Sequence, residues 1–206
     1  MIAVIDYGMG NLRSVQKALE VVGAKTILTS KPGDLKRCEK IVFPGVGSFG
    51  EAMRELKRLK LVEPIKDAIA EGKPFLGLCL GLQLLFEKSE ESPGVKGLCI
   101  LKGESKRFKF SGPKAVLKVP HMGWNEIKPR ARKNIKILKG VLSGSYMYFV
   151  HSYYVKPKDK SVTLTTTDYG IDFVSGISKD NIYAFQFHPE KSQALGLKIL
   201  NNFVRL

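Results

Sequence analysis

The chain contains 206 residues, and 44% of them are hydrophobic, which excludes a disordered or low-complexity chain and leaves enough apolar side chains for a core. No apolar run approaches the roughly 20 residues that a membrane-spanning helix needs. The N-terminal stretch reaches Asp6 without a preceding basic region, which argues against a signal peptide. Three cysteines, none of them in a CxxC pair, indicate a reducing, cytoplasmic setting without a zinc site.

The net charge of +15, from 34 basic and 19 acidic residues, is concentrated in one segment. Between residues 102 and 139 the only acidic side chains are Glu104 and Glu126, against 12 basic ones. These basic residues are Lys102, Lys106, Arg107, Lys109, Lys114, Lys118, Lys128, Arg130, Arg132, Lys133, Lys136 and Lys139. Such a cluster suggests a polyanionic partner, but Phe108, Phe110 and Trp124 lack the spacing of a nucleic-acid-binding motif. We therefore interpret the segment as solvated strands and turns.

The first half of the chain alternates short apolar runs with amphipathic segments of helical spacing. Strands are expected over residues 1–6, 26–29, 40–43 and 74–78. Helices are expected over residues 12–22, 48–59, 61–71 and 80–87, with Ser48 as a cap and Gly23 and Gly72 as stops. This alternation predicts βαβ units and a mostly parallel central sheet flanked by helices.

After Pro93 the pattern changes to short strands separated by turns that contain Gly and Pro. Strands are expected over residues 97–101, 116–119, 146–150, 161–167, 173–178 and 182–187, and a last amphipathic helix over residues 194–204. The chain has no linker-like segment and no internal repeat. We expect one α/β domain over residues 1–206, with additional antiparallel strands in its second half.

Residues 77–81 read Gly-Leu-Cys-Leu-Gly where a predicted strand runs directly into a helix. This is the pattern of a nucleophile elbow, with Cys79 in the place of the nucleophile. The strained turn requires small flanking residues and lifts the side chain out of the sheet. The helix start favours a thiolate, and the amide of Leu80 can bind an oxyanion. Cys38 and Cys99 lack the glycines, and we interpret them as structural cysteines.

A cysteine nucleophile needs a base, and His188 is the strongest candidate. It follows the predicted strand 182–187 and precedes Pro189, so it lies where a strand leaves the sheet, a place where chemistry collects in α/β folds. Glu190, two residues further on, can bind the other ring nitrogen and hold the tautomer. Cys79, His188 and Glu190 are therefore predicted to form a triad.

The other two histidines are weaker candidates. His151 has no carboxylate nearby in the sequence, and we interpret it as a structural or substrate-lining residue. His121 follows Pro120 and is interpreted as a loop residue.

A second element for binding an oxyanion follows the predicted strand 40–43. Here Pro44 precedes Gly45, Val46 and Gly47, and two glycines let backbone N–H groups approach a ligand closely. On its own this segment is a turn. Beside an elbow cysteine in the same sheet, it becomes a candidate oxyanion strand.

With these pieces in place, the chain resembles the class I glutamine amidotransferases, and among them the glutaminase subunits of imidazole glycerol phosphate synthases. The resemblance rests on motifs that span nearly the whole chain in the family's order. They are residues 6–11 (Asp-Tyr-Gly-Met-Gly-Asn), 44–50, 77–83, 120–125 (Pro-His-Met-Gly-Trp-Asn), 149–153 and 185–192 (Phe-Gln-Phe-His-Pro-Glu-Lys-Ser). It implies a flavodoxin-like fold of the class I amidotransferase type.

The resemblance also implies a reaction. Cys79 would attack the side-chain amide of glutamine, with His188 as base and then acid and Glu190 orienting the imidazole. The oxyanion would be bound by the amides of Leu80 and of residues 45–47, ammonia would leave, and water would resolve the glutamyl thioester. No cofactor or metal is implied. The residues that would grip the α-amino and α-carboxylate groups of glutamine are Gln83, Ser152 and Tyr153.

Members of this family pass ammonia to a separate (β/α)₈-barrel synthase subunit, which forms imidazole glycerol phosphate and an aminoimidazole carboxamide ribotide in histidine biosynthesis. The resemblance therefore implies a heterodimer, and Asn11, Met122 and Trp124 match positions at the subunit interface. Because the expected fold uses all 206 residues for the glutaminase, a partner is needed to consume the ammonia. The basic segment surrounds residues 120–125, so we expect an acidic or mixed-charge docking face on the partner and a salt-sensitive association.

Three other functions stay open at this point. The chain could be the glutaminase subunit of another class I amidotransferase, serving purine, pyridoxal or anthranilate synthesis. It could be a cysteine peptidase-like hydrolase on the same scaffold, which would cleave peptides and ignore glutamine. The net charge of +15 leaves a nucleic-acid-binding module as the third alternative.

Overall fold

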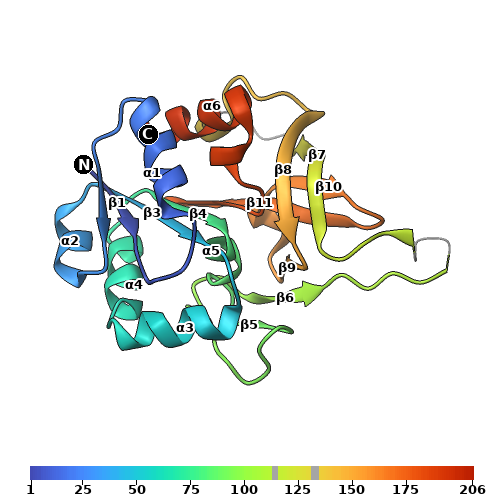
Figure 1. The fold of residues 1–206 in the computed structure, drawn as a ribbon, viewed down its shortest axis with the longest axis horizontal. Coiled ribbons are helices and arrows are strands. Elements are labelled where there is room, and N and C mark those ends of the chain that lie inside the picture. Colours follow the sequence, from blue (N-terminus) through green and yellow to red (C-terminus); the bar gives the residue numbers. More distant parts are fainter. Residues whose placement is uncertain (113–115, 131–134) are drawn as a thin grey trace.

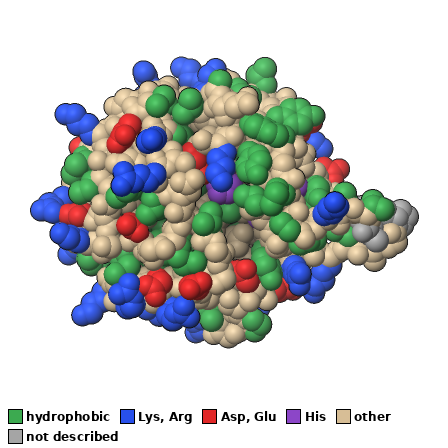
Figure 2. All heavy atoms as spheres, in the orientation of Figure 1, with side chains coloured by type: hydrophobic (Ala, Val, Ile, Leu, Met, Phe, Trp, Pro, Cys, Tyr) green, Lys and Arg blue, Asp and Glu red, His purple; other side chains and the backbone are tan. Residues whose placement is uncertain are grey.

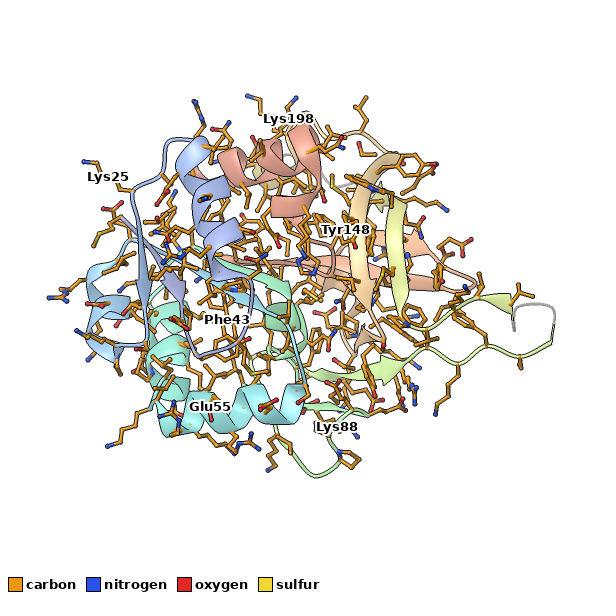
Figure 3. The ribbon with its side chains drawn as sticks, in the orientation of Figure 1. Lys25, Phe43, Glu55, Lys88, Tyr148 and Lys198 are labelled. Atoms are coloured by element: carbon orange, nitrogen blue, oxygen red, sulfur yellow. The ribbon has the colours of Figure 1, made fainter. Side chains whose placement is uncertain are left out.

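The structure is a computed structural model that describes residues 1–112, 116–130 and 135–206. Within these ranges a mixed, 12-stranded sheet crosses the molecule, with helices covering both faces of its parallel part (Figure 1). Side chains fill the space between the sheet and the helices, with Phe43 in the interior and Lys25 and Lys198 at the periphery (Figure 3). No helix among the described residues has the length and hydropathy of a membrane span.

The parallel part of the sheet contains the strands that position the predicted nucleophile. Its strands are β1 (Ile2–Ile5), β2 (Thr26–Thr29), β3 (Lys40–Gly45), β4 (Phe75–Cys79) and β12 (Ile182–Phe185), in the order β2-β1-β3-β4-β12. β1, β3 and β4 are buried almost throughout, because helices cover both faces, and their sequences are accordingly near-continuous apolar runs. β4 lies between β3 and β12, so Gly45 pairs with Cys79 and Phe185 with Leu78.

The helices form two layers, one on each side of these strands. They are α1 (Leu12–Val21), α2 (Pro32–Arg37), α3 (Phe49–Arg58), α4 (Val62–Ala70), the short α5 (Leu80–Gln83) and α6 (Gln193–Val204). The apolar faces of α1 and α6 pack into one core cluster, and those of α2, α3 and α4 pack into the other. Ser48 caps α3 by accepting a hydrogen bond from the Glu51 amide at 3.4 Å, as its position in the sequence predicts.

The second half of the chain extends the sheet with antiparallel strands. These are β5 (Lys88–Ser89), β6 (Gly103–Arg107), β7 (His121–Pro129), β8 (Ser145–His151), β9 (Tyr153–Pro157), β10 (Thr163–Asp168) and β11 (Asp172–Lys179), with 3₁₀ turns η2 (Lys136–Leu138), η3 (Lys160–Val162) and η4 (Pro189–Lys191). β11, β10, β7 and β8 follow β12 in order, while β9 and β6 branch from β11, and β5 pairs with β6. The expected α/β class, with a mostly parallel core and added antiparallel strands, is confirmed.

Several boundaries expected from the sequence are wrong. The helix predicted over residues 80–87 ends at Gln83, because the carbonyls of Leu84, Leu85 and Phe86 accept hydrogen bonds from the amides of residues 98–101. Because those amides donate to residues 84–86, they cannot donate to a neighbouring strand, and the strand predicted over residues 97–101 does not form. Residues 116–119 do not form a strand either, and Val116 is 82% exposed. The short α2 and the strands β5, β6, β7 and β9 were not predicted.

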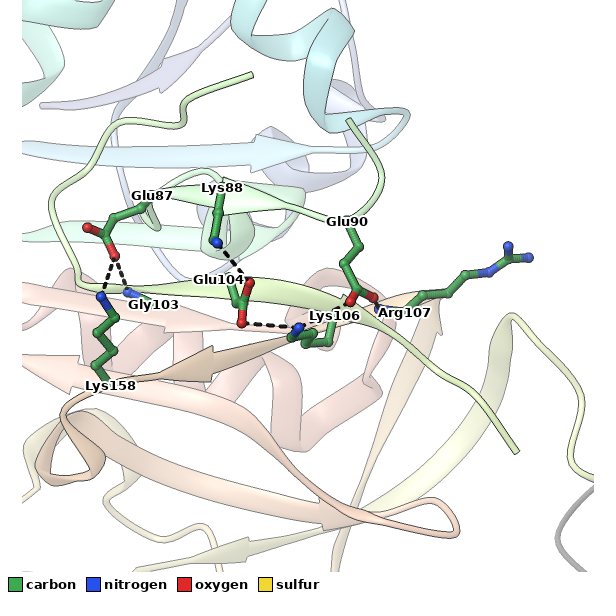
Figure 4. A network of polar contacts seen from close by, with 8 residues as sticks. All are labelled: Glu87, Lys88, Glu90, Gly103, Glu104, Lys106, Arg107 and Lys158. Carbon is green, nitrogen blue, oxygen red and sulfur yellow. Dashed lines mark hydrogen bonds and ion pairs between the residues drawn. The ribbon is translucent and has the colours of Figure 1, made fainter. Parts of the chain in front are cut away.

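Part of the basic segment is paired with acidic side chains at the surface. Lys106 Nζ lies 3.1 Å from a Glu90 carboxylate oxygen and 3.2 Å from a Glu104 carboxylate oxygen (Figure 4). The other carboxylate oxygen of Glu104 lies 3.4 Å from Lys88 Nζ. The Arg107 amide donates to the second oxygen of Glu90 at 2.9 Å. This network fastens β6 to the segment that follows α5.

The remaining positive charge is spread over the surface. Lys and Arg side chains lie around the face shown in Figure 2, with Asp and Glu side chains among them. Of the basic segment, Lys114, Arg132 and Lys133 lie outside the described residues.

Candidate active site

Cys79 sits on a strained turn between β4 and α5. It is the last residue of β4 and the N-cap of α5, with φ of +52° and ψ of −106°. A Cβ at Gly77 would lie 2.9 Å from the Gly81 carbonyl oxygen, and one at Gly81 would lie 3.1 Å from the Phe43 carbonyl carbon and closer still to its oxygen. Both glycines are therefore required by the close packing of the elbow. Because α5 has only four residues, its macrodipole contributes less than a long helix would.

His188 and Glu190 form a buried pair at the start of η4. The imidazole Nδ1 lies 2.8 Å from a Glu190 carboxylate oxygen, and the two side chains are 4% and 3% exposed. Because the carboxylate accepts, Nδ1 carries the proton and Nε2 is the basic nitrogen. Nε2 is buried and has no hydrogen-bond partner among the described residues.

The charge around His188 favours its protonated form. Burial by itself lowers the pKa of the imidazole, but the negative charge of Cys79 as a thiolate and the Glu190 carboxylate outweigh it and raise this pKa to about 10. The backbone of His188 is fixed as well, since its amide donates to the Tyr148 carbonyl at 2.9 Å and its carbonyl accepts from Ser192 Oγ at 2.6 Å. The group is thus held in place as a proton acceptor from a thiol.

A pocket of about 310 Å³ opens above the elbow and has room for a small ligand. Its lining residues are Val46, Gly47, Cys79, Leu80, Gln83, Glu91, Pro120, Val150, His151, Ser152 and Tyr153. The structure therefore brings the predicted nucleophile together with part of the candidate oxyanion strand and all three predicted substrate-binding residues. Gly45 lies just outside the lining, paired with Cys79 in the sheet.

Glu91 is a pocket residue that sequence reasoning missed. It is the only carboxylate among the described residues that line the pocket, and one of its oxygens accepts from the Phe49 amide at the start of α3 at 2.7 Å. A carboxylate in this place suits a ligand that carries an ammonium group. Glu91 follows Glu90 in a segment with no recognisable motif, so no sequence signal separated it from a surface acid.

Gln83 is engaged by the protein itself. Its Nε2 donates to the Tyr153 carbonyl and to Gln186 Oε1, both at 3.2 Å, and its side chain is buried. The two hydrogen bonds therefore hold the Gln83 side chain in one position beside the pocket.

His121 is not a loop residue, so that prediction is wrong. It is the first residue of β7, pairs with His151 across to β8, and is buried, with its Nδ1 3.0 Å from His151 Nε2. Pro120 precedes the strand instead of marking a loop. His151 lines the pocket, as one of its two interpretations proposed.

The three predicted interface residues lie outside the pocket, on the surface. Asn11 caps α1 by accepting from the Ser14 amide at 3.4 Å. Met122 and Trp124, on β7, are 62% and 46% exposed, and the Trp124 ring meets that of Tyr148 edge-on at 6.0 Å. Among the described residues, no group of three or more His, Cys, Asp or Glu side chains is placed to hold a metal.

Comparisons with known proteins show the family to which the chain is similar. The family model described as glutamine amidotransferase class-I matches residues 3–206. The imidazole glycerol phosphate synthase subunit HisH of Aquifex aeolicus is 54% identical over 203 residues, covering 98% of this chain and 95% of the relative. That of Methanocaldococcus jannaschii is 50% identical over 206 residues and is covered completely, as is this chain.

Solved structures show the same fold at low sequence identity. A crystal structure of a glutamine amidotransferase superposes with a TM-score of 0.76 at 16% identity and covers both chains fully. A chain in the structure of PurLQS from Thermotoga maritima superposes with a TM-score of 0.72 at 18% identity, covering 99% of this chain and 97% of that one.

Proposed function

The chain belongs to the class I glutamine amidotransferases, and we propose that it is the glutaminase subunit of an imidazole glycerol phosphate synthase. The observation that carries the proposal is the elbow cysteine, which lines a pocket sized for a small ligand and interacts with His188 of the buried pair His188 and Glu190. The proposed unit is a single glutaminase domain over residues 1–206, working in the cytoplasm.

In the proposed reaction His188 Nε2 takes the proton of the Cys79 thiol. The sulfur then bonds to the side-chain carbonyl carbon of glutamine, and the carbonyl electron pair moves to oxygen. Amides of Leu80 and of the strand formed by Gly45, Val46 and Gly47 donate to this oxyanion. When the carbon–nitrogen bond breaks, His188 gives its proton to the leaving nitrogen, and ammonia departs.

The thioester is then hydrolysed by water. His188 takes a proton from the attacking water, the carbon–sulfur bond breaks, and glutamate leaves while the Cys79 sulfur regains its electron pair. Glu190 keeps the imidazole in one tautomer throughout and stabilises its protonated form.

The pocket lining supports glutamine as the substrate. The Glu91 carboxylate matches the α-ammonium group of an amino acid, and it is the only carboxylate among the described lining residues. Ser152 and Tyr153 also line the pocket and are proposed to bind the α-carboxylate. Gln83, whose amide hydrogens are both used within the protein, is proposed to accept from the α-ammonium group through its Oε1. A pocket of about 310 Å³ has room for an amino acid.

The ammonia is proposed to pass to a (β/α)₈-barrel synthase subunit in a heterodimer, where it is used in histidine biosynthesis. The HisH relatives from Aquifex aeolicus and Methanocaldococcus jannaschii are named as subunits of a synthase, and this chain covers their whole length or nearly so. The exposed apolar side chains of Met122 and Trp124 support docking near β7, and Asn11 is proposed to join them. Apolar side chains exposed in this way are typical of protein interfaces.

The decisive experiment is to trap the nucleophile with a glutamine analogue that carries a diazo-ketone. Labelling is expected at Cys79 alone, and Cys79→Ala should abolish it. Cys99 is exposed and Cys38 is buried, so both serve as internal controls in the same chain. Equal labelling of either control, or none at Cys79, would overturn the assignment.

The partner is tested separately by measuring glutaminase rates with and without a barrel synthase chain and its acceptor substrate. The rate is expected to rise when both are present. Equal rates would remove the proposed synthase while leaving the glutaminase in place.

A further inference from the structure

Gln186 approaches the predicted nucleophile from the sheet. It lies between Phe185 and Phe187, whose rings stack in the core with centroids 4.7 Å apart, so its own side chain faces the opposite side of the chain. It is completely buried, and its amide Nε2 lies 3.6 Å from Cys79 Sγ, within hydrogen-bonding reach of a sulfur atom. Gln186 therefore contacts the reacting sulfur without lining the pocket.

The direction of this hydrogen bond follows from the neighbouring amide. Both hydrogens of Gln83 Nε2 are used, one by the Tyr153 carbonyl and one by Gln186 Oε1. Because Gln186 Oε1 accepts, the nitrogen of the same amide is the atom that faces Cys79, and an amide nitrogen can only donate hydrogen bonds. The sulfur must accept, and as a thiol it has the Val150 carbonyl at 3.9 Å for its own hydrogen.

A row of hydrogen-bonded groups, of which His121 and His151 are buried, holds the Tyr153 carbonyl. His151 Nδ1 donates to it at 2.8 Å, so His151 Nε2 accepts from His121 Nδ1 at 3.0 Å, and His121 Nε2 accepts from Asn125 Nδ2 at 3.2 Å. The second hydrogen of the Asn125 amide goes to the Asp168 carbonyl at 2.8 Å. Burial lowers the pKa of His121 to about 4 and that of His151 to about 3, so both rings are neutral at pH 7. Each hydrogen bond in the row thus has one possible direction.

We propose that Gln186 is a further catalytic residue: its side-chain amide donates a hydrogen bond to the Cys79 sulfur and favours the thiolate, and the row from Asn125 to Gln83 holds it in that orientation. An N–H donor stabilises a thiolate more than a thiol, because the acceptor then carries a charge. The hydrogen bond from Gln186 to the sulfur strengthens when His188 takes the thiol proton. It weakens when the sulfur forms a covalent bond to carbon and the negative charge moves to the oxygen. It forms again when the thioester is hydrolysed. This part in turnover rests on the proposed function, whereas the effect on the sulfur does not.

The test replaces the donor by a side chain of similar length, Gln186→Met, in a Cys99→Ser background. The rate at which iodoacetamide alkylates Cys79 is followed against pH by mass spectrometry, which needs neither glutamine nor a partner. The midpoint of this profile should rise by about one pH unit, a roughly tenfold loss of thiolate below the midpoint. Gln16→Met is the matched control, because the Gln16 amide donates to Thr26 Oγ1 at 3.3 Å between α1 and β2 and makes no contact with the sulfur, and it should leave the midpoint unchanged.

In turnover assays below that midpoint, the Gln186→Met variant should lose about tenfold in kcat with little change in KM. If Gln186→Met fails to fold, the side-chain ¹⁵N signals of Gln186 in the unmodified chain should titrate with the same midpoint as Cys79 alkylation. An unmoved midpoint in the folded variant, or amide signals that stay constant through the Cys79 midpoint, would overturn the proposal. If the unmodified chain shows no glutaminase activity with a barrel synthase chain and its acceptor present, while Gln186→Met shifts the midpoint, the proposed function is rejected and the role of Gln186 is kept.

Discussion

The packing of the elbow makes a strong prediction at Gly81. An alanine Cβ there would lie 3.1 Å from the Phe43 carbonyl carbon and well under 3.0 Å from its oxygen, a separation that real Cβ atoms essentially never show. The obstacle is backbone of β3, which is paired with β1 on one side and β4 on the other, so it has little room to give. Gly81 does not have a positive φ, so backbone strain adds nothing and the effect is steric.

Overpacking a well-packed core costs about 1–3 kcal/mol, and an obstacle that cannot rotate away places Gly81→Ala at the upper end, at about 3 kcal/mol. Relief requires α5 to move away from β3, which carries the Leu80 amide with it. Misplacing such a group by about 1 Å costs roughly a hundredfold in rate. The glutaminase rate should therefore fall about a hundredfold even in the fraction that folds.

The assay is urea unfolding, monitored by far-ultraviolet circular dichroism and by the fluorescence of the one tryptophan, Trp124, together with the glutaminase rate. Gly33→Ala is the matched control: Gly33 lies in α2, has no positive φ, and its Cβ would meet nothing within 4 Å. It should leave activity intact and raise stability by up to about 1 kcal/mol, since alanine is the better helix former. A Gly81→Ala protein within about 1 kcal/mol of the parent and fully active would refute this account of the elbow.

Three further predictions concern charge. Glu190→Gln keeps a side chain of similar size beside His188 Nδ1 but removes the carboxylate, so kcat should fall by about 10²–10⁴; a fall of less than threefold would contradict the assigned role. Burial lowers the pKa of His121 and of His151 below the unfolded value near 6.5. As the pH falls from about 6.5 to 4, each of these two histidines should therefore lower the free energy of unfolding by about 1.4 kcal/mol per pH unit. Urea unfolding at pH 7, 6 and 5 measures this loss, and equal stability at all three would show that the rings are not held neutral. Association with the barrel subunit should slow as salt rises, and a salt-independent rate would assign the basic segment to solubility alone.

The parts of the site that could be predicted are those set by local geometry. The elbow was predictable because the strained turn itself requires glycines on both sides of the cysteine, between a buried strand and a helix, and the strained φ of Cys79 agrees with it. The pair His188 and Glu190 was predictable because the two groups lie two residues apart, close to a strand end.

The parts that could not be predicted depend on contacts between distant segments. α5 stops after one turn because residues 98–101 donate to the carbonyls that would have continued it, and this pairing leaves no periodic trace in the sequence. Glu91 reaches the pocket because the segment that follows β5 folds back against the start of α3, where the Phe49 amide donates to Glu91. Gln186 belongs to a family motif, but its contact with Cys79 requires the parallel pairing of β12 with β4.

Strand β7 has one exposed and one inward-facing side, although the proline before it predicted a loop. Pro120 predicted a loop at His121, and no strand was predicted over these residues. In the structure Met122 and Trp124 are exposed, whereas His121 is buried and Asn125 reaches inward to its ring. A period of two therefore separates the residues proposed to meet a partner from those that hold the polar row behind the pocket. Because the two sets alternate along one strand, a register shift of a single residue would exchange them, and the ladder from His121 to His151 fixes that register.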